Sequence, residues 1–88
     1  MDAVKKKKLK SDAHHLNPVV MIGQSGLTAA VIAEIELALD AHELIKIKIR
    51  AERDERKEIC TEICAATTAE LIQAIGQIIV IYRHNPKK

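Results

Sequence analysis

The sequence predicts a small α/β domain: an N-terminal helix, then strand–helix–strand–helix–strand–strand with a mixed four-stranded sheet. Three observations predict this class. A short apolar run at 18–22 ends at a Gly-x-x-Gly stretch, residues 23–26, and a helical pattern follows. Residues 44–50 alternate between apolar and basic side chains, as in a half-buried strand. Two β-rich runs near the C-terminus flank a Gly-Gln pair, residues 76–77, which is typical of a hairpin.

The composition indicates one domain, residues 1–88, with an aliphatic core. The chain of 88 residues is 48% apolar but has one Tyr and neither Trp nor Phe. A charged fraction of 30% is ordinary for a folded chain and argues against disorder. The net charge of +2 is too small to indicate a nucleic-acid partner by itself. Evidence for such a partner must come from where the charged residues lie along the chain.

The sequence predicts neither membrane insertion nor secretion. No apolar run is long enough to span a bilayer, and the N-terminus has no secretory signal, so we expect a cytoplasmic protein. Cys60 and Cys64 are four residues apart in a helical pattern, where disulfide geometry is poor. In a reducing compartment they are interpreted as two small core residues.

The predicted N-terminal helix covers about residues 5–16. Its apolar stripe consists of Leu9, Ala13 and Leu16. Lysines surround this stripe, and they are either a solvated terminus or contacts for an anionic partner. These lysines are Lys5, Lys6, Lys7, Lys8 and Lys10.

The stretch Gly23-Gln24-Ser25-Gly26 joins a buried strand to a helix. A helix N-terminus presents unsatisfied amides and partial positive charge, so a phosphate could sit there. The alternative is that the glycines only make a tight turn. The motif alone does not separate the two interpretations.

The helix predicted from Leu27 to about Glu43 is acidic along its outer side, so a polyanion should touch only its N-terminal end. The strand at 44–50 follows. Its isoleucines face the core, and its other side is predicted to be a basic row facing solvent. That row consists of Lys46, Lys48 and Arg50.

Residues 51–68 return to helical spacing, with apolar positions inward. The mixed charges at 52–58 are interpreted as solvation. Because helices alternate with the first three strands, we expect these strands to pair in parallel through right-handed crossovers. The hairpin would add an antiparallel fourth strand that Tyr82 and Arg83 close, before a short basic tail at 84–88.

No catalytic constellation is present in the sequence. Ser25 lacks the flanking glycine spacing of a nucleophile elbow, and no P-loop occurs. Zinc binding by Cys60 and Cys64 with His14 and His15 would need unusual spacing. We therefore expect no enzyme activity, no cofactor, no metal and no small-molecule substrate.

Several motifs resemble the CRM domain, the chloroplast RNA splicing and ribosome maturation domain whose free-standing bacterial members are the YhbY proteins. The resemblance covers nearly the whole chain. It lies in Leu16-Asn17-Pro18-Val19-Val20, Ile22-Gly23-x-x-Gly26-Leu27-Thr28, His42-Glu43-Leu44-Ile45-Lys46-Ile47-Lys48, Ile75-Gly76 and Tyr82-Arg83. Two departures are Thr67-Thr68, where members often have glycine, and Gln77, where they often have lysine.

The resemblance implies a fold similar to the C-terminal domain of translation initiation factor three, and RNA as the partner. It also implies association with ribosomal RNA of the large-subunit precursor and contact of the Gly-x-x-Gly loop with RNA. Without exposed aromatic residues, recognition should be of phosphate and RNA shape. The alternative is a protein-interaction module on the ribosome that uses the acidic second helix. The expected RNA-binding residues are Gly23, Gln24, Ser25, Gly26, Lys5, Lys6, Lys7, Lys8, Lys10, Lys46, Lys48, Arg50 and Arg83.

Overall fold

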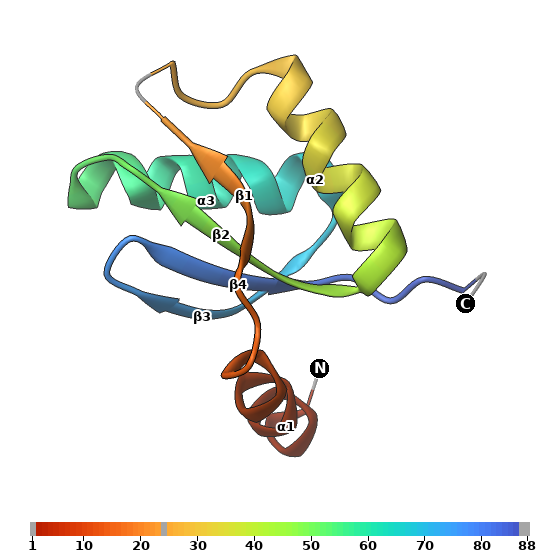
Figure 1. Ribbon diagram of the computed structural model, residues 1–88. Helices are drawn as coiled ribbons and strands as arrows, with labels where there is room; N and C mark the ends of the chain where they lie inside the picture. Colours follow the sequence, from red (N-terminus) through yellow and green to blue (C-terminus); the bar gives the residue numbers. More distant parts are fainter. Residues whose placement is uncertain (1, 24, 87–88) are drawn as a thin grey trace.

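The computed structural model describes residues 2–23 and 25–86, and it has the predicted order of elements (Figure 1). The elements are α1 (Ala3–Ala13), β1 (Pro18–Ile22), α2 (Ala29–His42), β2 (Leu44–Ile49), α3 (Arg53–Thr67), β3 (Glu70–Ile75) and β4 (Ile78–Tyr82). In these described ranges no helix combines the length and the hydropathy needed to cross a membrane.

Helix α1 lies a few residues earlier than predicted. It begins directly after Asp2, whose side chain accepts a hydrogen bond of 2.7 Å from the Lys5 amide. This N-cap satisfies one of the amides that a helix start leaves unpaired, which sets the boundary. Leu16, the last member of the predicted stripe, lies beyond the helix but still packs against the same apolar cluster.

The strand order is β1-β2-β4-β3. Strands β1 and β2 are parallel, and β4 is antiparallel to both β2 and β3. The expectation that the first three strands pair in parallel is therefore wrong for β3, which pairs with β4 at the edge of the sheet. The apolar strand β4, with buried Ile79, Val80 and Ile81, occupies the central position. Strand β3 carries an irregularity in its register and an exposed Glu70, features that suit an edge.

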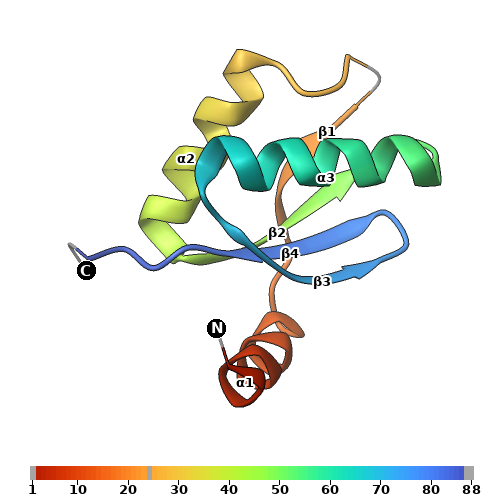
Figure 2. The ribbon, with the colours of Figure 1, turned by 180° about the vertical axis from the view of Figure 1, so that it is seen from behind.

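The two faces of the sheet are covered unequally (Figures 1 and 2). Helices α2 and α3 cover one face, where Ile45, Ile47 and Ile49 of β2 are buried in the main core. Helix α1 covers part of the other face through Leu9 and Ala13.

Because α1 covers part of that face, the basic side of β2 is not simply exposed to solvent. Lys46 and Lys48 are half-buried. The predicted solvent-facing row is therefore wrong for these two lysines, although Arg50, beyond the strand, is exposed.

Helix α3 ends on a threonine in a backbone conformation that glycine adopts more easily. Thr68 is left-handed, with φ 55° and ψ 27°. A β-branched side chain is uncommon in this conformation because its Cβ crowds the backbone. The departure from the family pattern at Thr67-Thr68 thus falls on a true helix C-cap.

We predict that Thr68→Gly raises the free energy of unfolding by about 0.5–1 kcal/mol, since relief of the left-handed strain exceeds the entropy cost of glycine. Urea unfolding measures the change. The control is Ala66→Gly, at an exposed position inside α3, which should lower the free energy by up to about 1 kcal/mol. Equal destabilisation by both changes would contradict the prediction.

Candidate nucleic-acid interface

Three connections meet at one end of the sheet. The Arg50 amide donates to the Ile22 carbonyl at 2.9 Å, which joins the ends of β1 and β2. The Ile49 amide donates to the Gln77 carbonyl at 2.7 Å, which adds the hairpin turn. The Gly-x-x-Gly loop, the β2–α3 connection and the hairpin turn therefore lie at the same end, here called the loop end (Figures 1 and 2).

The two glycines of the loop have different backbone requirements. Gly26 has φ +71°, and its amide donates to the Gly23 carbonyl at 3.1 Å to close a turn. Gly23 is exposed and has no such φ, and a Cβ added to it would meet nothing within 4 Å. Of these two loop glycines, the fold itself thus requires only Gly26. Gln24 lies outside the described residues.

The N-terminus of α2 follows this loop. The side chain of Thr28 caps the helix by accepting from the Val31 amide at 3.2 Å. The amides of Ala29 and Ala30, in the same first turn, have no partner within the helix. Together with the helix dipole they give this part of the loop end a partial positive charge.

Helix α1 and the sheet form a groove of about 210 Å³. Lys10 of α1 and the C-cap residue His14 line it on one side, and Lys46 of β2 lines it on the other. Lys48 follows two residues further along β2, and Arg50 reaches the loop end. We call Lys10, Lys46, Lys48 and Arg50 the cationic track.

The remaining lysines of α1 divide into two groups. The Lys5 ammonium lies 5.1 Å from the centre of the Tyr82 ring, a cation–π contact that occupies this face of the chain's one aromatic side chain. Lys6, Lys7 and Lys8 are exposed. Only Lys10 lies with Lys46 in the groove.

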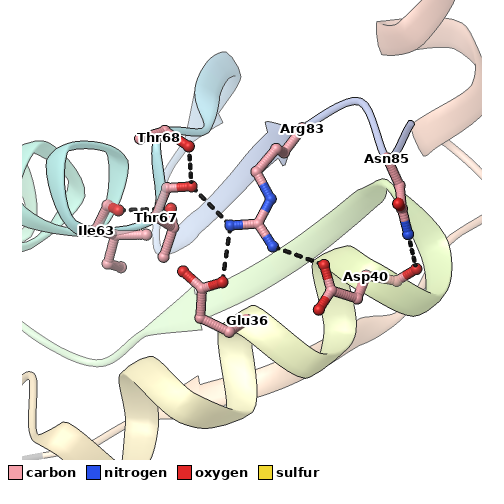
Figure 3. A network of polar contacts seen from close by, with 7 residues as sticks. All are labelled: Glu36, Asp40, Ile63, Thr67, Thr68, Arg83 and Asn85. Atoms are coloured by element: carbon pink, nitrogen blue, oxygen red, sulfur yellow. Dashed lines mark hydrogen bonds and ion pairs between the residues drawn. The ribbon is translucent and has the colours of Figure 1, made fainter. Parts of the chain in front are cut away.

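Arg83 lies at the opposite end of the sheet from the loop, because Tyr82 pairs with Leu44 at the start of β2. Its guanidinium donates to Glu36 at 2.8 Å, to Asp40 at 2.9 Å and to the Thr67 carbonyl at 2.7 Å (Figure 3). Burial alone would lower the pKa of Arg83, but the two carboxylates more than offset it and raise the pKa. The positive charge of Arg83 is thus paired with carboxylates inside the protein. Arg83 is therefore not part of the candidate interface.

The acidic side chains of α2 are largely engaged by the C-terminal segment. Besides Glu36 and Asp40, the Glu43 carboxylate accepts from the Asn85 amide at 2.7 Å and lies 3.3 Å from His84. The Asn85 side chain also donates to the Asp40 carbonyl at 2.8 Å (Figure 3). This helix is therefore a docking site for the chain's own C-terminal segment.

The two cysteines contact each other on α3. A hydrogen bond with Cys64 lowers the pKa of the Cys60 thiol to about 7, although burial acts in the opposite direction, and the pKa of Cys64 is raised. In the part of the chain that the structure describes, no three His, Cys, Asp or Glu side chains gather as metal ligands do.

Comparison with known proteins gives the family. The family model of the CRS1 / YhbY (CRM) domain matches residues 1–83. This chain belongs to the CRM domain family. A Pseudomonas aeruginosa relative of this CRM domain, PA4753, is named a probable RNA-binding protein. It is 49% identical over 83 residues, which cover 93% of this chain and 80% of that protein.

Two further relatives agree. A Haemophilus influenzae protein named as RNA-binding is 54% identical over 76 residues, covering 85% of this CRM domain and 77% of that protein. The solution structure of SAV1595 from Staphylococcus aureus, described as a candidate RNA-binding protein, superposes with a TM-score of 0.83. It is 36% identical and covers 97% of this chain, and the match covers 90% of SAV1595.

Sequence reasoning missed two features of this CRM domain. His14 lines the groove beside Lys10, at i+4 on the same side of α1, a spacing that could have indicated it. The partners of Arg83 carry a weaker signal, the i, i+4 pair of Glu36 and Asp40. Nothing local in the sequence indicates that Arg83 reaches that pair.

We predict that Arg83→Ala lowers the free energy of unfolding by about 1.5–3 kcal/mol, because two carboxylates and a carbonyl lose a charged donor. Chemical denaturation measures the change. The charge-matched control is Arg50→Ala, at an exposed position, which should stay within about 0.5 kcal/mol of the wild type. A similarly small change for Arg83→Ala would show that the network contributes little to stability.

Proposed function

We propose that this CRM domain is a non-catalytic RNA-binding protein that contacts the phosphate backbone through its loop end and its cationic track. The proposed RNA is ribosomal RNA in precursors of the large subunit, bound during ribosome assembly. The family and the names of the relatives support RNA as the partner. The resemblance described above supports the ribosomal target.

The observation that carries this proposal is the meeting of Lys10 and Lys46 in one groove. These lysines come from α1 and β2, and each is ordinary in its own sequence context. Lys48 and Arg50 extend the positive charge along β2 toward residues 23–26. Along β2 and the residue after it, Lys46 and Arg50 are four positions apart, about 13 Å in extended backbone, so this track could follow an RNA backbone rather than a single phosphate.

The contacts proposed here are with phosphate and RNA shape rather than with stacked bases. Base stacking needs an open aromatic face. One face of Tyr82 is covered by Lys5, and the residue is only partly exposed. Lysines act as point charges toward phosphates and do not discriminate between bases, so sequence preference should be weak.

The alternative, a protein-binding acidic α2, has less support from the geometry. Glu36 and Asp40 bind Arg83, and Glu43 binds Asn85. A basic partner of these carboxylates would compete with these internal contacts. RNA is therefore the better-supported partner.

The salt dependence of RNA affinity tests the proposal. With single-stranded RNA, log K should fall with log salt at a slope of roughly −0.7 for each phosphate contact, because bound counterions are released. Fluorescence anisotropy at four salt concentrations measures the slope. A flat response, or no binding at low salt, would favour the protein-binding alternative.

We predict that Gly23→Ala weakens RNA binding about tenfold without changing the thermal midpoint. The fold has room for this methyl group, whereas a phosphate held on loop amides does not. The comparison is Gly26→Ala, which should lower the thermal midpoint because φ is +71°. Full RNA affinity in Gly23→Ala would leave the loop with a turn role only.

We also predict that the double change Lys10→Glu with Lys46→Glu reduces the magnitude of the salt slope more than Lys7→Glu with Lys8→Glu. Both pairs change the net charge equally, but only the first lines the groove. Anisotropy titrations measure both slopes, and circular dichroism checks folding. Equal losses would mean that RNA responds to total charge and not to the groove.

The RNA target is tested in cells. Ultraviolet crosslinking of the tagged protein, followed by sequencing of the attached fragments, should enrich precursors of large-subunit ribosomal RNA. Enrichment of messenger RNA or of small-subunit RNA instead would contradict the ribosomal part of the proposal and leave RNA binding intact.

A further inference from the structure

A second groove, of about 590 Å³, lies between α3 and the β3–β4 hairpin, on the face of the sheet away from α1. Its volume is in the range of small-ligand sites. Arg53, Arg56 and Lys57 line one side of it, and Leu71, Ala74 and Ile79 line the apolar side. The cationic track described above includes none of these residues.

Helix α3 separates its charges by face. Positions 53, 56 and 57 follow helical spacing and point into the groove, whereas Asp54, Glu55 and Glu58 do not line it. The mixed-sign run that the sequence analysis interprets as solvation is thus cationic toward the groove. The two signs are mixed along the chain, but the three cations share the side of the helix that lines the groove.

The three cations are available to an anion. None of the ion pairs recorded among the described residues involves Arg53, Arg56 or Lys57. One nitrogen of Arg56 donates to the Ala51 carbonyl at 2.7 Å, which fixes the guanidinium and leaves its other donors unused by that bond. Fixed guanidinium groups bind phosphate with good geometry.

The groove opens toward the loop end. Gly76 of the hairpin turn lines it, and the neighbouring Gln77 accepts from Ile49 beside Arg50. An RNA strand on the cationic track and the Gly-x-x-Gly loop would therefore pass its mouth. This continuity favours a nucleotide over an acidic peptide, and the apolar lining favours a base over a bare phosphate.

We propose that this groove takes one unpaired nucleotide of the bound RNA, with its phosphate against Arg56 and the flanking Arg53 and Lys57. Its base would lie on Leu71 and Ala74. The inference rests on the proposed function, because the strand must first be held at the loop end. It assigns this protein a preference for RNA with an unstacked nucleotide, which the cationic track alone would not give.

The experiment compares two RNA hairpins that differ only by one bulged uridine. Wild-type protein should bind the bulged hairpin about tenfold more tightly, as expected when part of one base is buried against apolar side chains. Two variants should lose this preference and keep their affinity for the unbulged hairpin within about threefold. They are Leu71→Ala and the double change Arg53→Gln with Lys57→Gln.

The matched control is Ala65→Glu with Ala66→Glu, at exposed positions near the other end of α3, which changes the net charge by the same amount. It should keep the preference. A bulged 4-thiouridine should crosslink within residues 71–79, and thermal midpoints check that every variant is folded.

Three outcomes overturn the inference. If wild-type protein binds both hairpins equally, the groove takes no nucleotide but the proposed function stands. The same holds if the folded variants keep the preference, and an acidic peptide then becomes the better occupant. If wild-type protein binds neither hairpin at low salt, the proposed function fails together with the inference.

Discussion

The pairing of β4 with β2 is the constraint on which the rest of this structure depends. It joins segments far apart in the chain, from Leu44 opposite Tyr82 to Lys48 opposite Ile78. At one end it places the hairpin turn beside the ends of β1 and β2, which makes the loop end. At the other end it places Arg83 against α2 (Figure 3). Between them, Val80 and Tyr82 contribute to the apolar surface on which α1 packs.

The same pairing separates the acidic from the basic side chains in a protein of small net charge. The carboxylates of Glu36, Asp40 and Glu43, on α2 and its C-cap, contact Arg83 and Asn85, so these three offset little of the positive charge elsewhere. Lys10 and Lys46 line a groove on one face of the sheet, and Arg53, Arg56 and Lys57 line a groove on the other. A net charge of +2 therefore conceals two cationic grooves linked through the loop end. For a polyanion, this local arrangement matters more than the total charge.

The two loop glycines differ in whether the fold alone explains why glycine is present. Gly26 has a positive φ that other residues adopt at a cost, so its role in the turn is sufficient reason for its presence. Gly23 has neither a positive φ nor a close neighbour. Thr68 is the converse case, a left-handed position occupied without glycine. Physical necessity within the fold thus explains one loop glycine and leaves the other to the proposed contact with RNA.

The sequence by itself determined the type and order of every element and the buried side of β2, because periodicity is a local property that each segment carries. It also placed the loop glycines between strand and helix, and Lys46 and Lys48 on the side of β2 opposite the buried isoleucines. Only the tertiary structure decided that β4 lies between β2 and β3, that Arg83 serves α2, and that Lys10 meets Lys46. These outcomes depend on which strands pair and which helix covers which face. Such choices are settled by the burial of the whole apolar surface, which no single stretch of sequence encodes.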